Sequence, residues 1–219
     1  FILLVLVAIY SAYAARPSSH PHRGNGLTPY APGMFPYKVT SSDEAILKKG
    51  SPVLVQIPAG GDSPEGAKCL CIQDVECDAG NVWESVTSFG KYVGKVPKVK
   101  ECSVYESRVN NPKSKDRTRT DKVKMVVGVL PGYKYECYYD HTLHPSKSSV
   151  TWGLDFSKYS DFDDVQGHWH VKALSPTRTR VFYAADLKLR GAVPKPVLSF
   201  LSKVALKEST CWVKKDAEG

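Results

Sequence analysis

Tyrosine and histidine side chains recur on one face of a predicted strand, where they could orient a bound ligand. The alternating positions from 133 to 143 hold Tyr133, Tyr135, Cys137, Tyr139, His141 and Leu143. In a strand, alternate side chains share a face. Tyrosine and histidine are costly in a dry core without hydrogen-bond partners, and they cost less at a cavity or at a solvated surface. We expect this face to line an apolar pocket with a few polar groups, with plain core packing as the alternative.

Glu208 is the polar position that stands out on a predicted C-terminal helix, Val197 to Lys215. It falls on the apolar side of that helix, near Leu201 and Val204. The carboxylate either reaches solvent near the helix end or enters a cavity, where burial would raise its pKa. The complete set of predicted ligand-binding residues is Tyr135, Tyr139, Trp152, Leu154, Trp169, Val171, Tyr183, Leu201, Val204 and Glu208.

The histidines offer a weaker case for metal binding. His168 and His170 flank Trp169 and would point the same way from a strand, with His141 or His144 as further ligands. No carboxylate or cysteine stands at a fitting fixed spacing, so we predict no metal site. The common phosphate-binding, dinucleotide-binding, hydrolase and zinc-protease motifs are also missing from the sequence. We therefore assign no catalytic residue and expect no cofactor.

Six cysteines bear on the redox environment. Cys69, Cys71 and Cys77 share one face of a predicted strand, and neighbours two residues apart in a strand lie too far apart for easy bridging. No C-x-x-C sequence occurs. We interpret the cysteines mostly as small buried apolar residues, which fits a reducing compartment. A Cys102–Cys137 disulfide remains an alternative, because the strands that hold these residues could lie close together.

Charge and length indicate one moderately basic globular unit. The chain has 219 residues and a formal net charge of +8, with no internal repeat. That charge suits an anionic membrane surface better than a nucleic-acid groove, so we expect no nucleic-acid partner. The most polar stretch, Asn110 to Lys122, is either a solvated hairpin loop or a contact with lipid headgroups. Its candidate contact residues are Lys113, Lys115, Arg117 and Arg119.

The first forty residues have the composition of a targeting segment. Phe1 to Tyr10 is a short apolar run, followed by an A-x-A cleavage pattern at Ala12–Ala14, and no acidic residue occurs before Asp43. This order resembles the bipartite plastid presequences of algae with complex plastids, so we predict a plastid protein, with secretion as the alternative. We expect residues 1–40 to be disordered or removed, 41–215 to form a single domain and 216–219 to form a tail.

The elements that must position the candidate residues are mainly strands. Short connections between the strands favour antiparallel pairing. The few helices lie in the first half of the chain and at its C-terminal end, which is typical of an α+β fold. Helices are expected near Ser41 to Lys49, over Val82–Phe89 and over Val197–Lys215. The expected strands are Ser51–Pro58, Lys68–Cys77, Val99–Arg108, Lys122–Leu130, Tyr133–His144, Val150–Ser157, Gly167–Leu174 and Thr179–Arg190.

Four stretches carry a likeness to a known superfamily. They are Ala79–Phe89; Tyr92–Pro97 with Val99 and Lys100; Val150–Leu154 with Gly167–Val171; and Thr179–Leu187 with Pro194–Trp212. In composition and order they resemble the START-like superfamily, which includes polyketide cyclases/dehydrases and lipid-transport proteins. The coenzyme Q-binding START-like proteins look most similar. The resemblance implies a helix-grip fold, in which an antiparallel sheet curls around a long C-terminal helix and leaves a cavity.

The same resemblance implies a function. We expect binding of an apolar ligand (a lipid, quinone or isoprenoid) between the sheet and the C-terminal helix, with transfer or sequestration and without catalysis. One alternative is a cyclase or dehydratase that uses tyrosine, histidine or glutamate in the same cavity as acid–base groups. Another is an assembly factor for plastid membranes.

Overall fold

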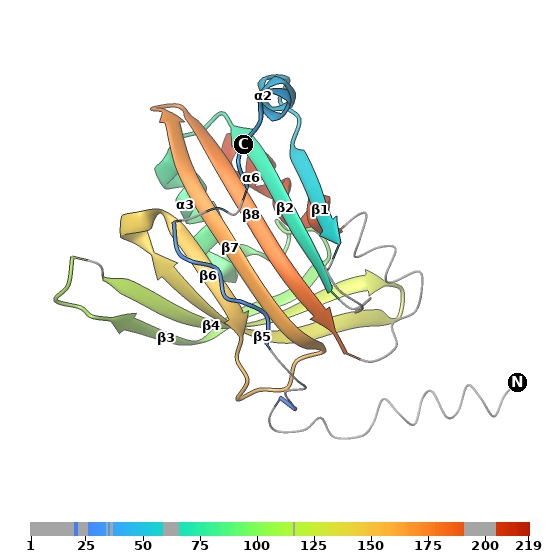
Figure 1. Ribbon diagram of the computed structural model, residues 1–219. Helices are drawn as coiled ribbons and strands as arrows, with labels where there is room; N and C mark the ends of the chain where they lie inside the picture. The colour runs from blue at the N-terminus through green and yellow to red at the C-terminus, as the bar shows by residue number, and fades with distance from the viewer. Residues whose placement is uncertain are drawn as a thin grey trace, which may run out of the picture.

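A single eight-stranded antiparallel sheet forms the body of the computed structural model, which describes residues 20–21, 26–33, 35, 37–58, 66–115, 117–190 and 205–219. The strand order is β1-β2-β8-β7-β6-β5-β4-β3 (Figure 1). The strands are β1 (Val53–Pro58), β2 (Gly66–Val75), β3 (Val99–Asn110), β4 (Thr118–Leu130), β5 (Tyr133–His144), β6 (Ser149–Leu154), β7 (Phe162–Ser175) and β8 (Arg178–Leu189). The helices are α2 (Ser41–Lys48), α3 (Ala79–Thr87), α5 (Ala205–Thr210) and α6 (Trp212–Glu218), with short 3₁₀ turns η2 (Phe89–Lys91) and η3 (Pro145–Lys147).

Every predicted strand is present, but β7 begins five residues earlier than expected. Asp163 and Asp164 precede the predicted strand Gly167–Leu174, yet both side chains are buried within β7. The carboxylate of Asp164 accepts hydrogen bonds from the backbone N–H groups of Leu27 (2.6 Å) and Val165 (2.8 Å). Lys188 Nζ lies 3.5 Å from the Asp163 carboxylate. These partners offset the desolvation that would otherwise exclude two carboxylates from a sheet.

The early helices begin at side-chain caps. Asp78 precedes α3 and accepts hydrogen bonds from the backbone N–H groups of Gly80 and Asn81. Thr40 and Asp43 form the capping box of α2, because Thr40 supplies a hydroxyl three residues before an acid.

The predicted helix Val197–Lys215 is described only from residue 205 onward, since residues 191–204 lie outside the described part of the chain. The described part consists of α5 and α6, separated by a turn at Cys211. The helical residues continue past the predicted end at Lys215 to Glu218, so most of the expected tail is helix. Trp212 and Val213 are buried in the main core with α3, so the C-terminal helix is held by the curled sheet, as predicted.

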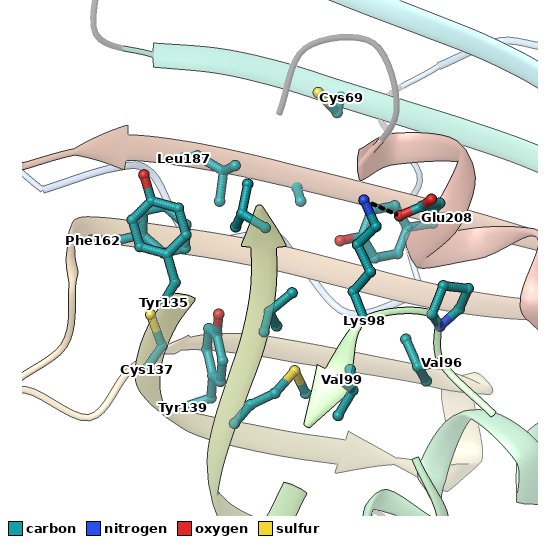
Figure 2. Close-up of a pocket in the computed structure, with 16 residues that line it drawn as sticks. Cys69, Val96, Lys98, Val99, Tyr135, Cys137, Tyr139, Phe162, Leu187 and Glu208 are labelled. Carbon is teal, nitrogen blue, oxygen red and sulfur yellow. Dashed lines mark ion pairs between the residues drawn. The ribbon is translucent and has the colours of Figure 1, made fainter. Parts of the chain in front are cut away.

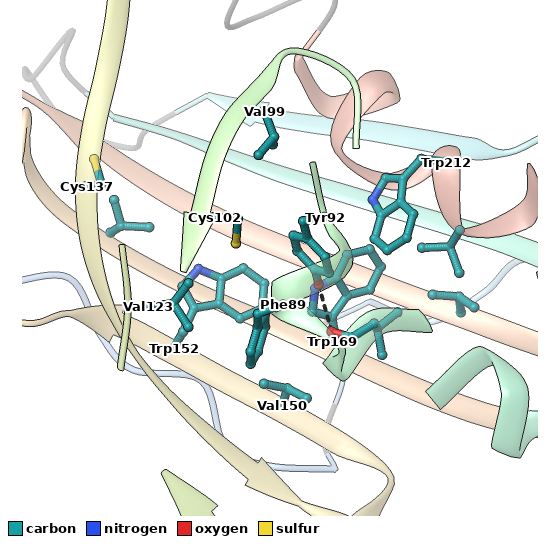
Figure 3. Close-up of a cluster of buried hydrophobic side chains, with 14 of the residues drawn as sticks. Phe89, Tyr92, Val99, Cys102, Val123, Cys137, Val150, Trp152, Trp169 and Trp212 are labelled. Atoms are coloured by element: carbon teal, nitrogen blue, oxygen red, sulfur yellow. Dashed lines mark hydrogen bonds between the residues drawn. The ribbon is translucent and has the colours of Figure 1, made fainter. Parts of the chain in front are cut away.

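The main core lies between the concave face of the sheet and helices α3 and α6 (Figure 3). Val82 and Val86 from α3 are fully buried there. The Tyr92 hydroxyl donates a 2.7 Å hydrogen bond to the backbone carbonyl of Val86, and the Tyr92 ring meets Trp212 edge to face at 5.1 Å. Tyr92, which directly follows η2, therefore contacts both α3 and α6.

Several described residues between 20 and 35 pack on the opposite face of the sheet, whereas the sequence predicts that residues 1–40 are disordered or removed. Tyr30 donates a 2.9 Å hydrogen bond to Asp186, and the Gly33 N–H donates one of 2.9 Å to Ser149. The Phe35 ring lies 4.8 Å from that of Phe182. His20 is buried and contacts the backbone carbonyl of Asp163 at 2.8 Å. These contacts are made mainly by aromatic residues. The basic, proline-rich composition around them did not indicate that they would pack on the sheet.

Candidate functional site

An apolar cavity of about 170 Å³ opens between the sheet and α5 (Figure 2). Its walls come from the start of β3, the second half of β4, the first half of β5, and β8, with Phe162 at the start of β7 and Glu208 from α5. On β4 the alternate residues Met125, Val127 and Val129 face it, since alternate side chains of a strand share a side. The cavity therefore occupies the end of the concave face that lies near the β4–β5 turn.

Four of the ten predicted ligand-binding residues line this cavity: Tyr135, Tyr139, Tyr183 and Glu208. Four others fill the main core instead, and they are Trp152, Leu154, Trp169 and Val171. Leu201 and Val204 lie outside the described residues. The predicted residues divide in this way because one end of the concave face lines the cavity and the rest of it packs in the core. Near the β4–β5 turn the face borders open space, whereas α3, η2 and α6 cover it farther along.

Several lining residues were not among the predicted ones, and Lys98 is the most informative of them. It precedes β3 in a left-handed conformation with φ of 65°, which a lysine rarely adopts. Its carbonyl accepts a 2.9 Å hydrogen bond from the Gly128 N–H, which anchors the residue to β4. The strand alternation at Met125, Val127 and Val129 could have identified the β4 wall, but no local sequence signal places Lys98 at the cavity.

Tyr135 provides a buried polar group in the cavity wall. The residue is 7% exposed, its hydroxyl has no hydrogen-bond partner among the described residues, and its ring stacks on Phe162 at 4.6 Å. Burial raises the pKa of Tyr135, and the neighbouring Tyr133 hydroxyl, which lies outside good hydrogen-bond geometry, raises it further. The phenol is therefore neutral at physiological pH. It can donate a hydrogen bond to an oxygen atom of a ligand.

Tyr139 lies deeper along the same face of β5. Burial is the main cause that raises the pKa of its hydroxyl, with the Cys137 thiol beside it as a further one. Burial also raises the pKa of Cys137, to about 12. Both groups are uncharged at neutral pH, so this part of the wall offers weak polar contacts within an apolar surface.

An ion pair stands at the mouth of the cavity. Lys98 Nζ lies 3.6 Å from Glu208 Oε2, and the two side chains are 34% and 31% exposed (Figure 2). Both alternatives considered for Glu208 therefore hold in part, because its carboxylate borders the cavity and also reaches solvent. At this exposure such a pair contributes little to stability, up to about 1 kcal/mol. It joins α5 to the start of β3 across the opening.

A basic groove adjoins the mouth and shares Lys98 and Val129 with the cavity. Lys100 and Lys134 line it, together with the turn between β4 and β5. The stem of Lys100 lies over Gly128, where an added Cβ would be 3.2 Å from Lys100 Cε. The loop between β3 and β4, interpreted from the sequence as either a solvated loop or a lipid contact, lies at the other end of these two strands (Figure 1).

The histidines lie on different faces of the sheet. His141 is in the main core against Phe89 and Trp152, and burial lowers its pKa to about 3. His168 and His170 stack on each other at 6.3 Å on the opposite face. Within the described residues, no group of three or more histidine, cysteine or acidic side chains could hold a metal ion.

Among the residues that the structure describes, no helix is long and apolar enough to span a bilayer.

Solved structures with the same fold are numerous, although neither protein-family models nor curated proteins give a match to the sequence. A START superfamily protein from Mycobacterium smegmatis aligns with a TM-score of 0.55 at 17% identity, covering 69% of this chain and 97% of its own. An aromatase/cyclase from a Streptomyces species aligns with a TM-score of 0.56 at 17% identity, covering 70% and 94%. A protein from Thermus thermophilus gives 0.54 at 14% identity, covering 69% and 94%. The chain therefore has the START-like, helix-grip fold that the sequence predicts.

Proposed function

We propose that this START-like chain binds an apolar small molecule between β4, β5, β8 and α5, and that it holds or transfers the molecule without chemical change. The observation that carries the proposal is the cavity wall, which is built from valine, leucine, methionine and aromatic side chains. Burying apolar ligand surface there is favourable by about 25 cal/mol per Å². The fold shared with a START superfamily protein and an aromatase/cyclase supports binding of a small molecule.

A lipid, quinone or isoprenoid is the proposed ligand class. The buried Tyr135 hydroxyl favours a ligand with an oxygen acceptor, and its stacked partner Phe162 favours a flat ring. A quinone of the coenzyme Q type meets both requirements. A cavity near 150 Å³ holds about one benzene-sized ring, so a longer isoprenoid tail would leave through the mouth beside Lys98 and Glu208.

The mouth also suggests how the protein could approach a membrane. Lys113, Lys115, Arg117 and Arg119 are the candidate lipid contacts of a stretch that is otherwise a solvated loop, and they lie at the other end of β3 and β4 from the cavity. Lys98, Lys100 and Lys134 stand beside the mouth itself. We therefore propose that these three lysines, here called the basic rim, face anionic headgroups when the ligand enters or leaves.

An enzyme of the cyclase or dehydratase type is the second candidate, because several structural neighbours are named aromatase/cyclases. Such chemistry needs two titratable groups that converge on one substrate atom. Within the described residues, Glu208 is paired with Lys98 at the mouth, whereas Tyr135 lies beside Phe162 across the cavity (Figure 2). This separation favours binding over catalysis.

Two further proposals concern the cellular setting. The presequence composition supports import into a complex plastid, with secretion as the alternative, and sequencing the N-terminus of the protein isolated from its cells would distinguish the two. An assembly role at plastid membranes would instead require a stable protein partner, which co-purification at endogenous levels would detect.

The direct test of the proposed function is to identify what the protein carries. The chain would be purified without detergent, extracted with organic solvent and compared by mass spectrometry with an unrelated protein purified in parallel. We expect one class of apolar compound in a reproducible ratio to protein, and transfer of ubiquinone between vesicles. If no compound is enriched and no ubiquinone is transferred, the proposal is contradicted.

A further inference from the structure

A strap from the N-terminal part of the chain covers a histidine on the outer face of the sheet, opposite the cavity. The strap consists of the described residues 26–33 and Phe35, and it crosses β6, β7 and β8 (Figure 1). The rings of Tyr30 and Phe35 both stack on the ring of His168, at centroid distances of 5.8 and 6.2 Å. Because His168 is fully buried, the strap and the sheet together enclose its imidazole.

Hydrogen bonds attach the strap to side chains of the sheet and not to its strand ladders. The eight strands pair with one another without the strap. The strap can therefore lift while the strand pairing stays intact, which is a local opening of the kind that native proteins undergo. The hydrogen bonds run from the Tyr30 hydroxyl to Asp186 (2.9 Å), from the Gly33 N–H to Ser149 (2.9 Å) and from the Leu27 N–H to Asp164 (2.6 Å).

The enclosed imidazole of His168 is poorly suited to carry a charge. Both of its ring nitrogens are buried, and neither has a hydrogen-bond partner among the described residues. A neutral imidazole has one N–H group, whereas the charged ring has two, and burying a charge without hydrogen bonds is costly. Burial accordingly lowers the pKa of His168 to about 4, and the nearby His170 and His144 act in the same direction. The closed strap therefore favours the neutral ring.

Titratable and charged groups of both signs surround this site. His170 and His144 oppose a further positive charge on His168, whereas the Asp186 carboxylate favours one. Stacking on two aromatic rings also favours a cation. Burial outweighs these attractions, since it is the largest cause of the lowered pKa. The groups around the site are His170 and Asp164 on β7, His144 on β5, Lys147 on η3, Asp186 on β8 and Tyr30 of the strap.

We propose that the strap is an acid-released cover, which separates from the outer face of the sheet when His168 takes up a proton. An exposed histidine takes up its proton near pH 6.5, so the open strap allows protonation at a higher pH than the closed strap does. The closed form is therefore fully favoured above that pH and loses stability as the pH falls toward about 4. Release would expose His168 and Phe182, whose ring lies 4.8 Å from that of Phe35. The device lies on the face opposite the cavity, so it does not depend on the proposed ligand.

Amide hydrogen exchange of the full chain, followed by NMR, tests the release. The Gly33 amide is the reporter, because its acceptor is the Ser149 hydroxyl, which does not titrate in this range. Its protection factor is its exchange rate in an unstructured peptide at the same pH divided by its rate in the protein. We expect this factor to fall roughly fiftyfold between pH 7 and pH 4.5. Unchanged protection would overturn the proposal, and so would exchange of Gly33 at the same rate as the amides of β6 and β7, since the opening would then be global.

Two variants identify the group that responds to acid. His168→Leu removes the titrating ring and keeps a side chain of similar size, so the protection of Gly33 should change by less than about threefold between the two pH values. The matched control is His141→Phe, which removes a buried histidine from the concave face and should leave the roughly fiftyfold fall in place. A full fall in His168→Leu would overturn the proposal, because a carboxylate such as Asp164 or Asp186 would then release the strap.

Two measurements on the wild-type protein decide the matter if His168→Leu does not fold. The His168 ring, followed by NMR, should stay neutral at pH 6 and take up its proton only at lower pH. A ring that is charged at pH 6 beneath a protected Gly33 amide would overturn the proposal. Sequencing the N-terminus of the protein from its cells should find a chain that begins before residue 26. A mature chain that begins after Phe35 would lack the strap and would overturn the proposal as well.

Discussion

The indole ring of Trp152 lies directly over the backbone of Gly167, so that a Cβ added to the glycine would be 1.9 Å from the ring. The two residues face each other across β6 and β7. This contact belongs to the filled part of the concave face, where Trp152 and Trp169 pack under the helices. The hollow part begins beyond it, at Tyr139 and Tyr135. The relationship therefore marks where the core ends and the cavity begins.

Gly167→Ala is expected to destabilise the protein strongly, because neither the ring nor the strand backbone can move without disturbing the core. We expect a loss of about 2–4 kcal/mol in the free energy of unfolding, measured by urea denaturation. Gly90→Ala provides the control, since nothing lies within 4 Å of an added Cβ there. A stability equal to that of the control would show that Trp152 does not occupy this position.

Glu208→Gln is expected to change ligand binding more than stability. The Lys98–Glu208 pair is partly solvated, so its loss should cost less than about 1 kcal/mol. An apolar ligand in the mouth removes the side chain at position 208 from water, and this costs less free energy for a neutral amide than for a carboxylate. The neutral fluorescent probe N-phenylnaphthylamine should therefore bind to the variant roughly threefold tighter or more. The matched control is Glu84→Gln, whose exposed carboxylate pairs with Lys91 away from the cavity. Identical affinity in both variants would remove Glu208 from the site.

The basic rim predicts where an anionic membrane would touch the protein. Reversing two of its charges, with Lys100→Glu and Lys134→Glu together, should weaken binding to vesicles containing anionic lipid by at least about tenfold, as measured by co-sedimentation. The same reversal at Lys113 and Lys115, in the loop at the far end of β3 and β4, should have a smaller effect. If the loop variant loses more binding than the rim variant, the membrane contact lies at the loop.

Buried His141 predicts a loss of stability in acid. Its pKa is lowered to about 3 in the folded protein, against an ordinary value of 6.5, because burial disfavours the charged ring. The unfolded chain therefore binds the proton first as pH falls below 6.5, and stability contributed by the neutral ring is lost down to about pH 3. This amounts to up to about 5 kcal/mol. His141→Phe should flatten the dependence of stability on pH in this window, whereas an unchanged profile would refute the assignment.

The strands and fold class could be predicted because alternation and turn residues are local signals. The sequence likewise placed Tyr135, Tyr139 and Tyr183 on a face that borders the cavity. The sequence could not show whether Trp152 and Trp169 line the cavity or fill the core, because the core and the cavity lie on the same face of the sheet. Lys98 also escaped prediction, since its position depends on an unusual backbone conformation and a hydrogen bond from Gly128.

Long-range packing explains the other differences. The Cys102–Cys137 alternative fails because each residue pairs with Met125 from opposite sides, so two strand spacings, about 10 Å, separate them. That distance exceeds the reach of a disulfide. The contacts of Tyr30 and Phe35 with the outer face of the sheet were equally invisible, because composition alone cannot reveal a surface that a segment covers.

Filling the cavity tests the central claim most directly. Val129 is 3% exposed and lines the cavity wall, so Val129→Trp places an indole where the ligand should lie. Val109→Trp is the control, because Val109 is 40% exposed near the far end of β3. Both variants and wild type would be titrated with ubiquinone after their Tm values are shown to agree. We predict binding by wild type and Val109→Trp, and a loss of at least about tenfold in affinity for Val129→Trp. Equal affinity in all three proteins would contradict a ligand site in this cavity.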